Sequence, residues 1–176
     1  EATYTVGRNL TLESRTTPAN AQLLALWSRQ KELSEKLTSH AELISSREPH
    51  RACLFVMADR LRATKDRNAD LMYTGYEEFL DDLKTVQKSL AEAGAVRSAY
   101  GPVQTLIWQV ETFGFHMVEM EFRQHSIVHT RALEDIREHG LHGERGTLEP
   151  MTQEVLSTFR ALGAIQKHNG RKAAGR

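Results

Sequence analysis

The sequence predicts a mostly helical protein with one short β-strand, of the kind that occurs in α/β barrels. Apolar residues recur at helical spacing over most of the chain, most clearly from Tyr76 to Ala93. Gly114 interrupts this spacing, and from Phe115 to Gln124 apolar and polar residues alternate as in a strand. Helical spacing then resumes, and a helix, a strand and a further helix form the repeating unit of parallel sheets and barrels.

The region before the strand is expected to be helical, interrupted by polar loops. Residues 1–17 are weakly patterned and are interpreted as the end of an element that begins upstream. Helices are expected at 19–37, from Glu48-Pro49 onward, at 76–93, and from Gly101-Pro102 to the strand. The serine-rich stretch 38–48 and the charged stretch 65–75 are expected to be loops.

After the strand, Ser126 is the expected N-cap of a helix that contains Ile127, Leu133 and Ile136. The glycine-rich stretch 139–146 is expected to be a loop, and Pro150 to precede a helix with Val155, Phe159 and Leu162 on one side. The chain is therefore expected to comprise a helical region, 1–112, and a strand–helix region, 113–176.

Composition excludes several functional classes. The 23 basic and 23 acidic residues give a formal net charge of zero, which argues against a nucleic-acid binder with a broad basic surface. No apolar run is long enough to span a bilayer, so no membrane partner is expected. A single cysteine, Cys53, cannot form an intrachain disulfide, which is typical of a reducing cytoplasm. The composition thus predicts a soluble cytoplasmic protein.

Arg123 is the residue to which we assign chemistry. It lies at the carboxyl end of the expected strand, where α/β barrels place their active sites, on the same face as Glu119 and Glu121. A guanidinium there suits a phosphate or a carboxylate. The alternative is that Arg123 only neutralises one of these glutamates.

Other candidate residues are given structural roles. Cys53 and Trp108 are expected in the core. Asp81 and Asp82 diverge on a helix and are expected on the solvated surface. His125 and His129 are spaced four apart, and with His116 and Glu121 they leave open a small metal site.

The segment FGFHMVEMEFRQHSIVHTRAL resembles the FGFH…RQHS segment of bacterial, actinobacterial-type phosphoenolpyruvate carboxylases. SREPHRACLFVMADRLRAT, LDDLKTVQKSL and LSTFRALGAIQKHNG are similar to helices of the same family, in the same order. The resemblance implies part of a TIM-type barrel with many extra helices, within one incomplete domain of a larger enzyme. It departs from the family at Glu121, where an aspartate is usual.

The resemblance implies a carbon–carbon lyase that carboxylates phosphoenolpyruvate with bicarbonate, giving oxaloacetate and phosphate. It also implies Mg2+ or Mn2+ and a cytoplasmic homotetramer. Arg123 and Gln124 would contribute to substrate binding, Arg123 as the clamp on the anionic substrate and Gln124 as the neighbour that orients Arg123. No catalytic residue or metal ligand is expected in this chain, because motifs similar to TARPTE and GYSDS are absent. The chain alone is therefore expected to be inactive. The alternatives are a non-catalytic helical assembly module and a small His/Glu metal-binding protein.

Overall fold

The computed structural model describes residues 1–34, 36, 47–119 and 121–174. Within these residues the chain is mostly helical, as the sequence predicts, and it divides into two compact units. Unit 1 comprises Glu1–Phe115 and unit 2 comprises His116–Arg176. The expected loop at 38–48 lies largely outside the described residues.

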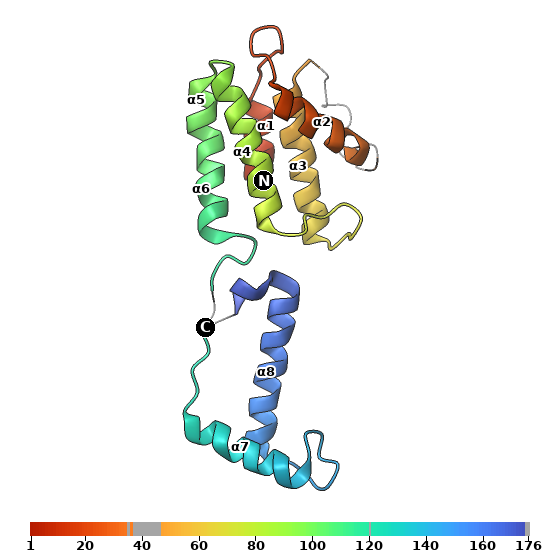
Figure 1. Ribbon diagram of the computed structural model, residues 1–176, viewed down its shortest axis with the longest axis vertical. Coiled ribbons are helices and arrows are strands. Elements are labelled where there is room, and N and C mark those ends of the chain that lie inside the picture. Colours follow the sequence, from red (N-terminus) through yellow and green to blue (C-terminus); the bar gives the residue numbers. More distant parts are fainter. Residues whose placement is uncertain (35, 37–46, 120, 175–176) are drawn as a thin grey trace. The chain divides into compact units, whose positions relative to one another are not determined.

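Unit 1 is a bundle of helices arranged around α3 (Figure 1). Its elements are α1 (Ala2–Asn9), α2 (Ala21–Ser34), α3 (Pro49–Lys65), α4 (Tyr76–Glu92), α5 (Val96–Ser98), η2 (Ala99–Val103) and α6 (Gln104–Phe113). Helix α3 packs against α1, α2 and α4, and α4 packs in turn against η2 and α6. The sequence predicts three of these helices within a few residues, but it does not predict α1.

Helix α3 is the centre of the unit 1 core. All side chains from Ala52 to Met57 are fully buried, so the helix is apolar around its circumference over this stretch. Leu54 and Met57 join Leu23 of α2 and Leu83 of α4 in one apolar cluster. Gly7 lets α1 approach closely, because a Cβ at this position would lie 3.1 Å from Leu54 Cβ. Cys53 belongs to the same core, as expected.

Helix α6 begins differently from the expectation. Gly101-Pro102 does not open it, because Pro102 lies inside the π-helical turn η2, which continues from α5 into α6. Proline lacks the N–H of the i→i−4 ladder and its ring clashes with the carbonyl four residues earlier, so a regular α-helix is disfavoured at Pro102, where the chain forms a π-turn. Trp108, expected in the core, is 61% exposed, since α6 turns Leu106, Ile107 and Val110 toward the bundle instead.

Unit 2 is a pair of helices with a short 3-10 turn. It contains α7 (Ser126–His139), α8 (Pro150–Asn169) and η3 (Arg171–Ala173). Helix α8 packs against α7 and η3. The N-cap of α7 is His125 rather than the expected Ser126: the His125 ring accepts a hydrogen bond from the Ile127 N–H at 3.2 Å. The expected loop lies between α7 and α8.

The strand expected over 115–124 is wrong for the described residues. Residues 114–118 form turns and bends, Met117 has a φ of +64°, and residues 121–125 have no regular secondary structure. A strand is stabilised by its ladder with a neighbour, and no described residue of this segment belongs to such a ladder. Alternation in the described residues of this segment is therefore not sufficient to form a strand.

Candidate functional site

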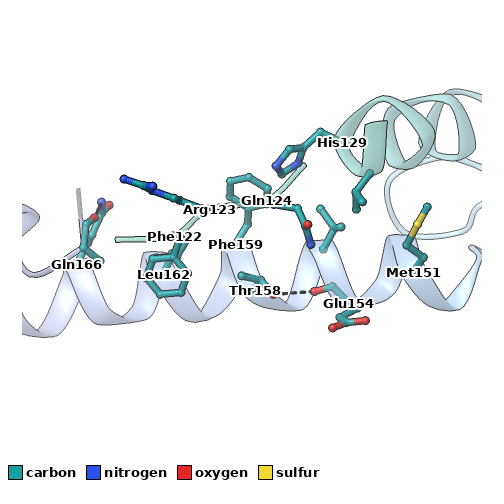
Figure 2. Close-up of a pocket in the computed structure, with 13 residues that line it drawn as sticks. Phe122, Arg123, Gln124, His129, Met151, Glu154, Thr158, Phe159, Leu162 and Gln166 are labelled. Atoms are coloured by element: carbon teal, nitrogen blue, oxygen red, sulfur yellow. Dashed lines mark hydrogen bonds between the residues drawn. The ribbon is translucent and has the colours of Figure 1, made fainter. Parts of the chain in front are cut away.

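Unit 2 contains a pocket between one face of α8 and a wall formed by the non-helical segment and the start of α7 (Figure 2). Its cavity volume is about 350 Å3. One wall is formed by Phe122, Arg123, Gln124, Val128 and His129; the other is formed by Met151, Glu154, Val155, Thr158, Phe159, Leu162 and Gln166, with Ala174. The helical spacing of Val155, Phe159 and Leu162 indicates this apolar wall. The polar residues between them were not singled out.

Arg123 and Gln124, the two residues selected from the sequence, both line this pocket. Arg123 Nε lies 2.9 Å from Glu121 Oε1, so the pairing with Glu121 left open above is present. The Arg123 side chain is 83% exposed, and exposed ion pairs contribute at most about 1 kcal/mol. Because its pair with Glu121 is weak, Arg123 is able to bind another anion. Gln124 Oε1 accepts a hydrogen bond from the His125 N–H at 3.0 Å.

The histidines of this region have structural contacts. His125 caps α7, outside the helix as expected, and the His129 ring packs on Phe159 with centroids 5.8 Å apart. Among the described residues, no group of three His, Cys, Asp or Glu side chains is placed to hold a metal ion. The described histidines and carboxylates of this region are therefore not arranged as a metal site.

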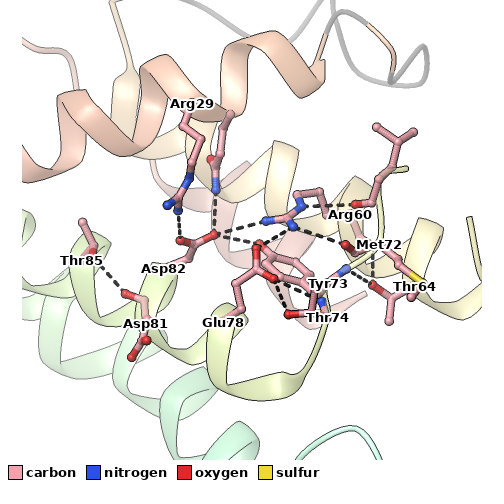
Figure 3. Close-up of polar contacts among 12 residues, drawn as sticks. Arg29, Arg60, Thr64, Met72, Tyr73, Thr74, Glu78, Asp81, Asp82 and Thr85 are labelled. Carbon is pink, nitrogen blue, oxygen red and sulfur yellow. Dashed lines mark hydrogen bonds and ion pairs between the residues drawn. The ribbon is translucent and has the colours of Figure 1, made fainter. Parts of the chain in front are cut away.

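A second polar cluster, in unit 1, was missed by the sequence analysis (Figure 3). Asp82 of α4 is only 3% exposed, contrary to the expected solvated position. Arg29 donates to its Oδ1 at 2.8 Å, whereas Gln30 and Tyr73 donate to its Oδ2 at 3.1 and 3.2 Å. These donors come from α2 and from the chain after α3, so the sequence around Asp82 does not reveal them.

Arg60 of α3 joins this cluster to the loop that precedes α4. Its guanidinium donates to Glu78 Oε1 at 2.7 Å, lies 3.6 Å from Asp82 Oδ2, and stacks 3.7 Å from the centre of the Tyr73 ring. It also donates to the backbone carbonyl of Leu71 at 3.2 Å. These contacts fix the expected loop at 65–75 against the helices, which is a structural role.

Burial and pairing act in opposite directions on the carboxylates. Burial raises the pKa of Asp82 and outweighs the effect of its donors. Partial burial opposes ionisation of Glu78 as well, but hydrogen bonds from Arg60 and Thr74 hold its pKa below the ordinary value. No cavity opens onto these groups among the pockets described, so we assign the chemistry to the unit 2 pocket.

Comparison with known proteins identifies the family. The family profile of phosphoenolpyruvate carboxylase matches residues 1–176. The chain belongs to the phosphoenolpyruvate carboxylase family. Its curated relatives include the phosphoenolpyruvate carboxylases of Xanthomonas oryzae pv. oryzae (39% identical over 87 residues) and Chromobacterium violaceum (33% over 131 residues). That of Glycine max is 31% identical over 124 residues.

The matched regions cover 49%, 69% and 64% of this chain, respectively. They cover only 10%, 14% and 13% of these relatives, so the chain corresponds to a small segment of a phosphoenolpyruvate carboxylase. No helix within the described residues is both long and apolar enough to cross a membrane.

Proposed function

We propose that this chain supplies part of the substrate-binding site of a phosphoenolpyruvate carboxylase, with Arg123 as the group that binds the anionic substrate. The observation that carries the proposal is the pocket of unit 2, in which Arg123 and Gln124 line a cavity of about 350 Å3 that also has an apolar side with Val155, Phe159 and Leu162. A guanidinium beside an apolar wall matches a small ligand with a phosphate and a carboxylate on an apolar carbon frame.

In the proposed enzyme, phosphoenolpyruvate reacts with bicarbonate and yields oxaloacetate and phosphate. Arg123 would stabilise the negative charge that develops on the substrate while its phosphoryl group is transferred to bicarbonate. Gln124 would hold the adjacent backbone, since its side chain already bonds the His125 N–H. Mg2+ or Mn2+ would be held by residues outside this chain.

The parent enzyme would also supply the strands with which residues 115–124 pair. Residues 115–124 would become extended on pairing with neighbouring strands of a TIM-type barrel, because their alternation provides the two faces that a sheet requires. The parent enzyme would be a cytoplasmic homotetramer. The chain alone would be inactive, because it lacks the catalytic histidine motif of the family.

Binding of phosphoenolpyruvate to the 15N-labelled chain tests the assignment. The Nε–Hε signal of Arg123 and the side-chain amide of Gln124 are expected to shift on titration, and Arg123→Ala is expected to abolish the response. Arg131→Ala, an exposed arginine of α7 outside the pocket lining, is the matched control. In a phosphoenolpyruvate carboxylase that contains this segment, Arg123→Ala is expected to lose most of the carboxylation rate. Normal turnover by that variant would refute the role.

A non-catalytic helical module is the second candidate, and the helical character of both units favours it. Analytical ultracentrifugation of the chain distinguishes the two. A stable, discrete oligomer that does not bind phosphoenolpyruvate supports the module.

A further inference from the structure

The turn that joins α7 to α8 is held by polar groups rather than by an apolar core. In the described part of unit 2 the buried side chains are few and mostly small: Ala132, Asp135, Leu148, Thr152, Ala173 and Ala174. Asp135 is the one charged residue among them, and it lies where α7 faces the start of α8. A buried carboxylate at this position requires partners, because leaving it unpaired is costly.

Asp135 joins the two ends of the loop at 140–148. Its Oδ1 lies 2.8 Å from Nδ1 of His139, the last residue of α7. Its Oδ2 accepts a hydrogen bond at 2.9 Å from the backbone N–H of Glu149, the N-cap of α8. Gly146 completes the closure, because a Cβ there would lie 2.5 Å from Cδ2 of the His139 ring. One carboxylate thus fixes where α7 ends and where α8 begins.

The opposite charges of Asp135 and His139 strengthen the contact that closes the loop between α7 and α8. The Asp135 side chain accepts a hydrogen bond from His139, which raises the pKa of that imidazole against the effect of burial. The Thr152 hydroxyl, the Glu149 N–H and His139 together lower the pKa of Asp135. Both shifts favour the charged pair. The cation also lies at the C-terminal end of α7, where the helix dipole stabilises it.

The turn lies between the two helices that contribute to the pocket lining. One pocket wall includes Val128 and His129 of α7, and the other follows α8 from Met151 to Gln166. The stretch of α8 from Thr152 to Gln166 is about 21 Å long at 1.5 Å per residue. A rotation of α8 by about 10° at the turn would therefore move the far end of the pocket wall by roughly 4 Å. A displacement of that size would alter any site that needs positioning within about 1 Å.

We propose that Asp135 is a positioning residue for the pocket: by holding His139 and the Glu149 N–H together, it sets the angle between α7 and α8 and hence the separation of the pocket walls. Its importance for catalysis rests on the proposed function, whereas its effect on the two helices does not. Asp135 touches no pocket-lining residue through the hydrogen bonds described, so it acts through the helices.

A distance measurement between the two helices tests this role. Spin labels at Ser126→Cys and Ala161→Cys, both exposed, are placed on a Cys53→Ala background and measured by electron–electron double resonance. The parent is expected to give one narrow distance distribution. Asp135→Ala is expected to at least double its width or to add a second distance, and His139→Gln, which removes one arm, to broaden it less.

Glu138→Gln is the matched control, because it removes a neighbouring exposed carboxylate of α7 and is expected to leave the distribution unchanged. Circular dichroism shows whether each variant keeps its helices. If Asp135→Ala loses helix, His139→Gln alone decides the question. A parent-like distribution in whichever variant retains its helices overturns the proposal.

Phosphoenolpyruvate titration of the same variants separates this inference from the proposed function. If the parent binds, Asp135→Ala is expected to weaken binding at least fivefold while the Arg123 signal remains in the spectrum, and Asp135→Glu to recover part of the loss. Unchanged affinity in Asp135→Ala would contradict a role in positioning. If the parent does not bind but the distances change as expected, the proposed function fails and the control of the interhelical angle stands.

Discussion

The stability of unit 1 is expected to depend on pH through His50, a fully buried residue of α3. His50 Nε2 lies 2.9 Å from Ser89 Oγ of α4, and no described group forms a hydrogen bond to Nδ1. Burial lowers the pKa of this imidazole from 6.5 to about 4. The folded chain therefore keeps His50 neutral at pH values where the unfolded chain takes up a proton.

The direction of this pH dependence follows from the number of protons that the folded and unfolded states bind. Between pH 6.5 and about 4 the unfolded state binds the extra proton, so stability falls as the pH is lowered through this window. At about 1.36 kcal/mol per pKa unit, the free energy of unfolding should fall by about 2 kcal/mol from roughly pH 7.5 to roughly pH 5. Asp82 acts in the opposite direction, because its raised pKa lets the folded state bind a proton first.

Urea denaturation followed by tryptophan fluorescence measures this term, since both tryptophans, Trp27 and Trp108, lie in unit 1. Replacing His50 by Gln should remove the loss of about 2 kcal/mol and leave only the contributions of the other titrating groups. His168→Gln, at an exposed position of α8, is the control and should keep the parental pH dependence. An equal loss of stability in the parent and in His50→Gln would refute this account.

The remaining predictions concern the polar cluster, one glycine and the turn of unit 2. Asp82→Asn should lower the free energy of unfolding by about 3 kcal/mol in urea titrations, because it removes the buried charge that pairs with Arg29 and Arg60 and leaves Arg60 with Glu78 as its carboxylate partner. The exposed Asp81→Asn should change it by less than about 0.5 kcal/mol, and equal effects would contradict the burial of Asp82. Gly94 ends α4 with a φ of +81°, so Gly94→Ala should cost about 1 kcal/mol by the same assay, and a gain in stability would argue against the left-handed conformation. The pKa of His139 should lie above 6.5 in an NMR pH series, and it should be lower in Asp135→Asn than in the parent. The stability that this raised pKa contributes is fully present below pH 6.5 and is lost as the pH rises through the pKa of His139 in the folded chain. A measured pKa of His139 at or below 6.5 would exclude its pairing with Asp135.

The helices could be predicted from the sequence because their signals are local. Apolar spacing along 76–93 and the glycine after it correspond to α4 (Tyr76–Glu92) and to the positive φ of Gly94. Pro49 marks the first turn of α3, as expected. The segment around Arg123 likewise indicated the family, which the match over residues 1–176 then established.

The strand prediction was wrong for the described residues, and the reason is not local. Alternation at 115–124 gives a segment two faces, but a strand exists only when another segment pairs with its backbone. Arg123 and Gln124 nevertheless line a pocket with α8, a contact between residues far apart in sequence. The spacing of Val155, Phe159 and Leu162 predicted an apolar face, but not that this face would meet Arg123.

By itself, the sequence determined the family of the chain and the positions of its main helices, and it indicated Arg123 as the candidate residue for binding an anion. Only the tertiary structure decided which charged and aromatic side chains are buried. Asp81 and Asp82 are adjacent in one helix, yet Asp82 alone is enclosed, because Arg29, Arg60 and Tyr73 converge on it from other parts of the chain. Trp108 is exposed for the complementary reason: its own helix turns other residues toward the core. Helical periodicity is set by neighbours along the chain, whereas the partners of a charge or an aromatic ring are set by segments that meet only after folding.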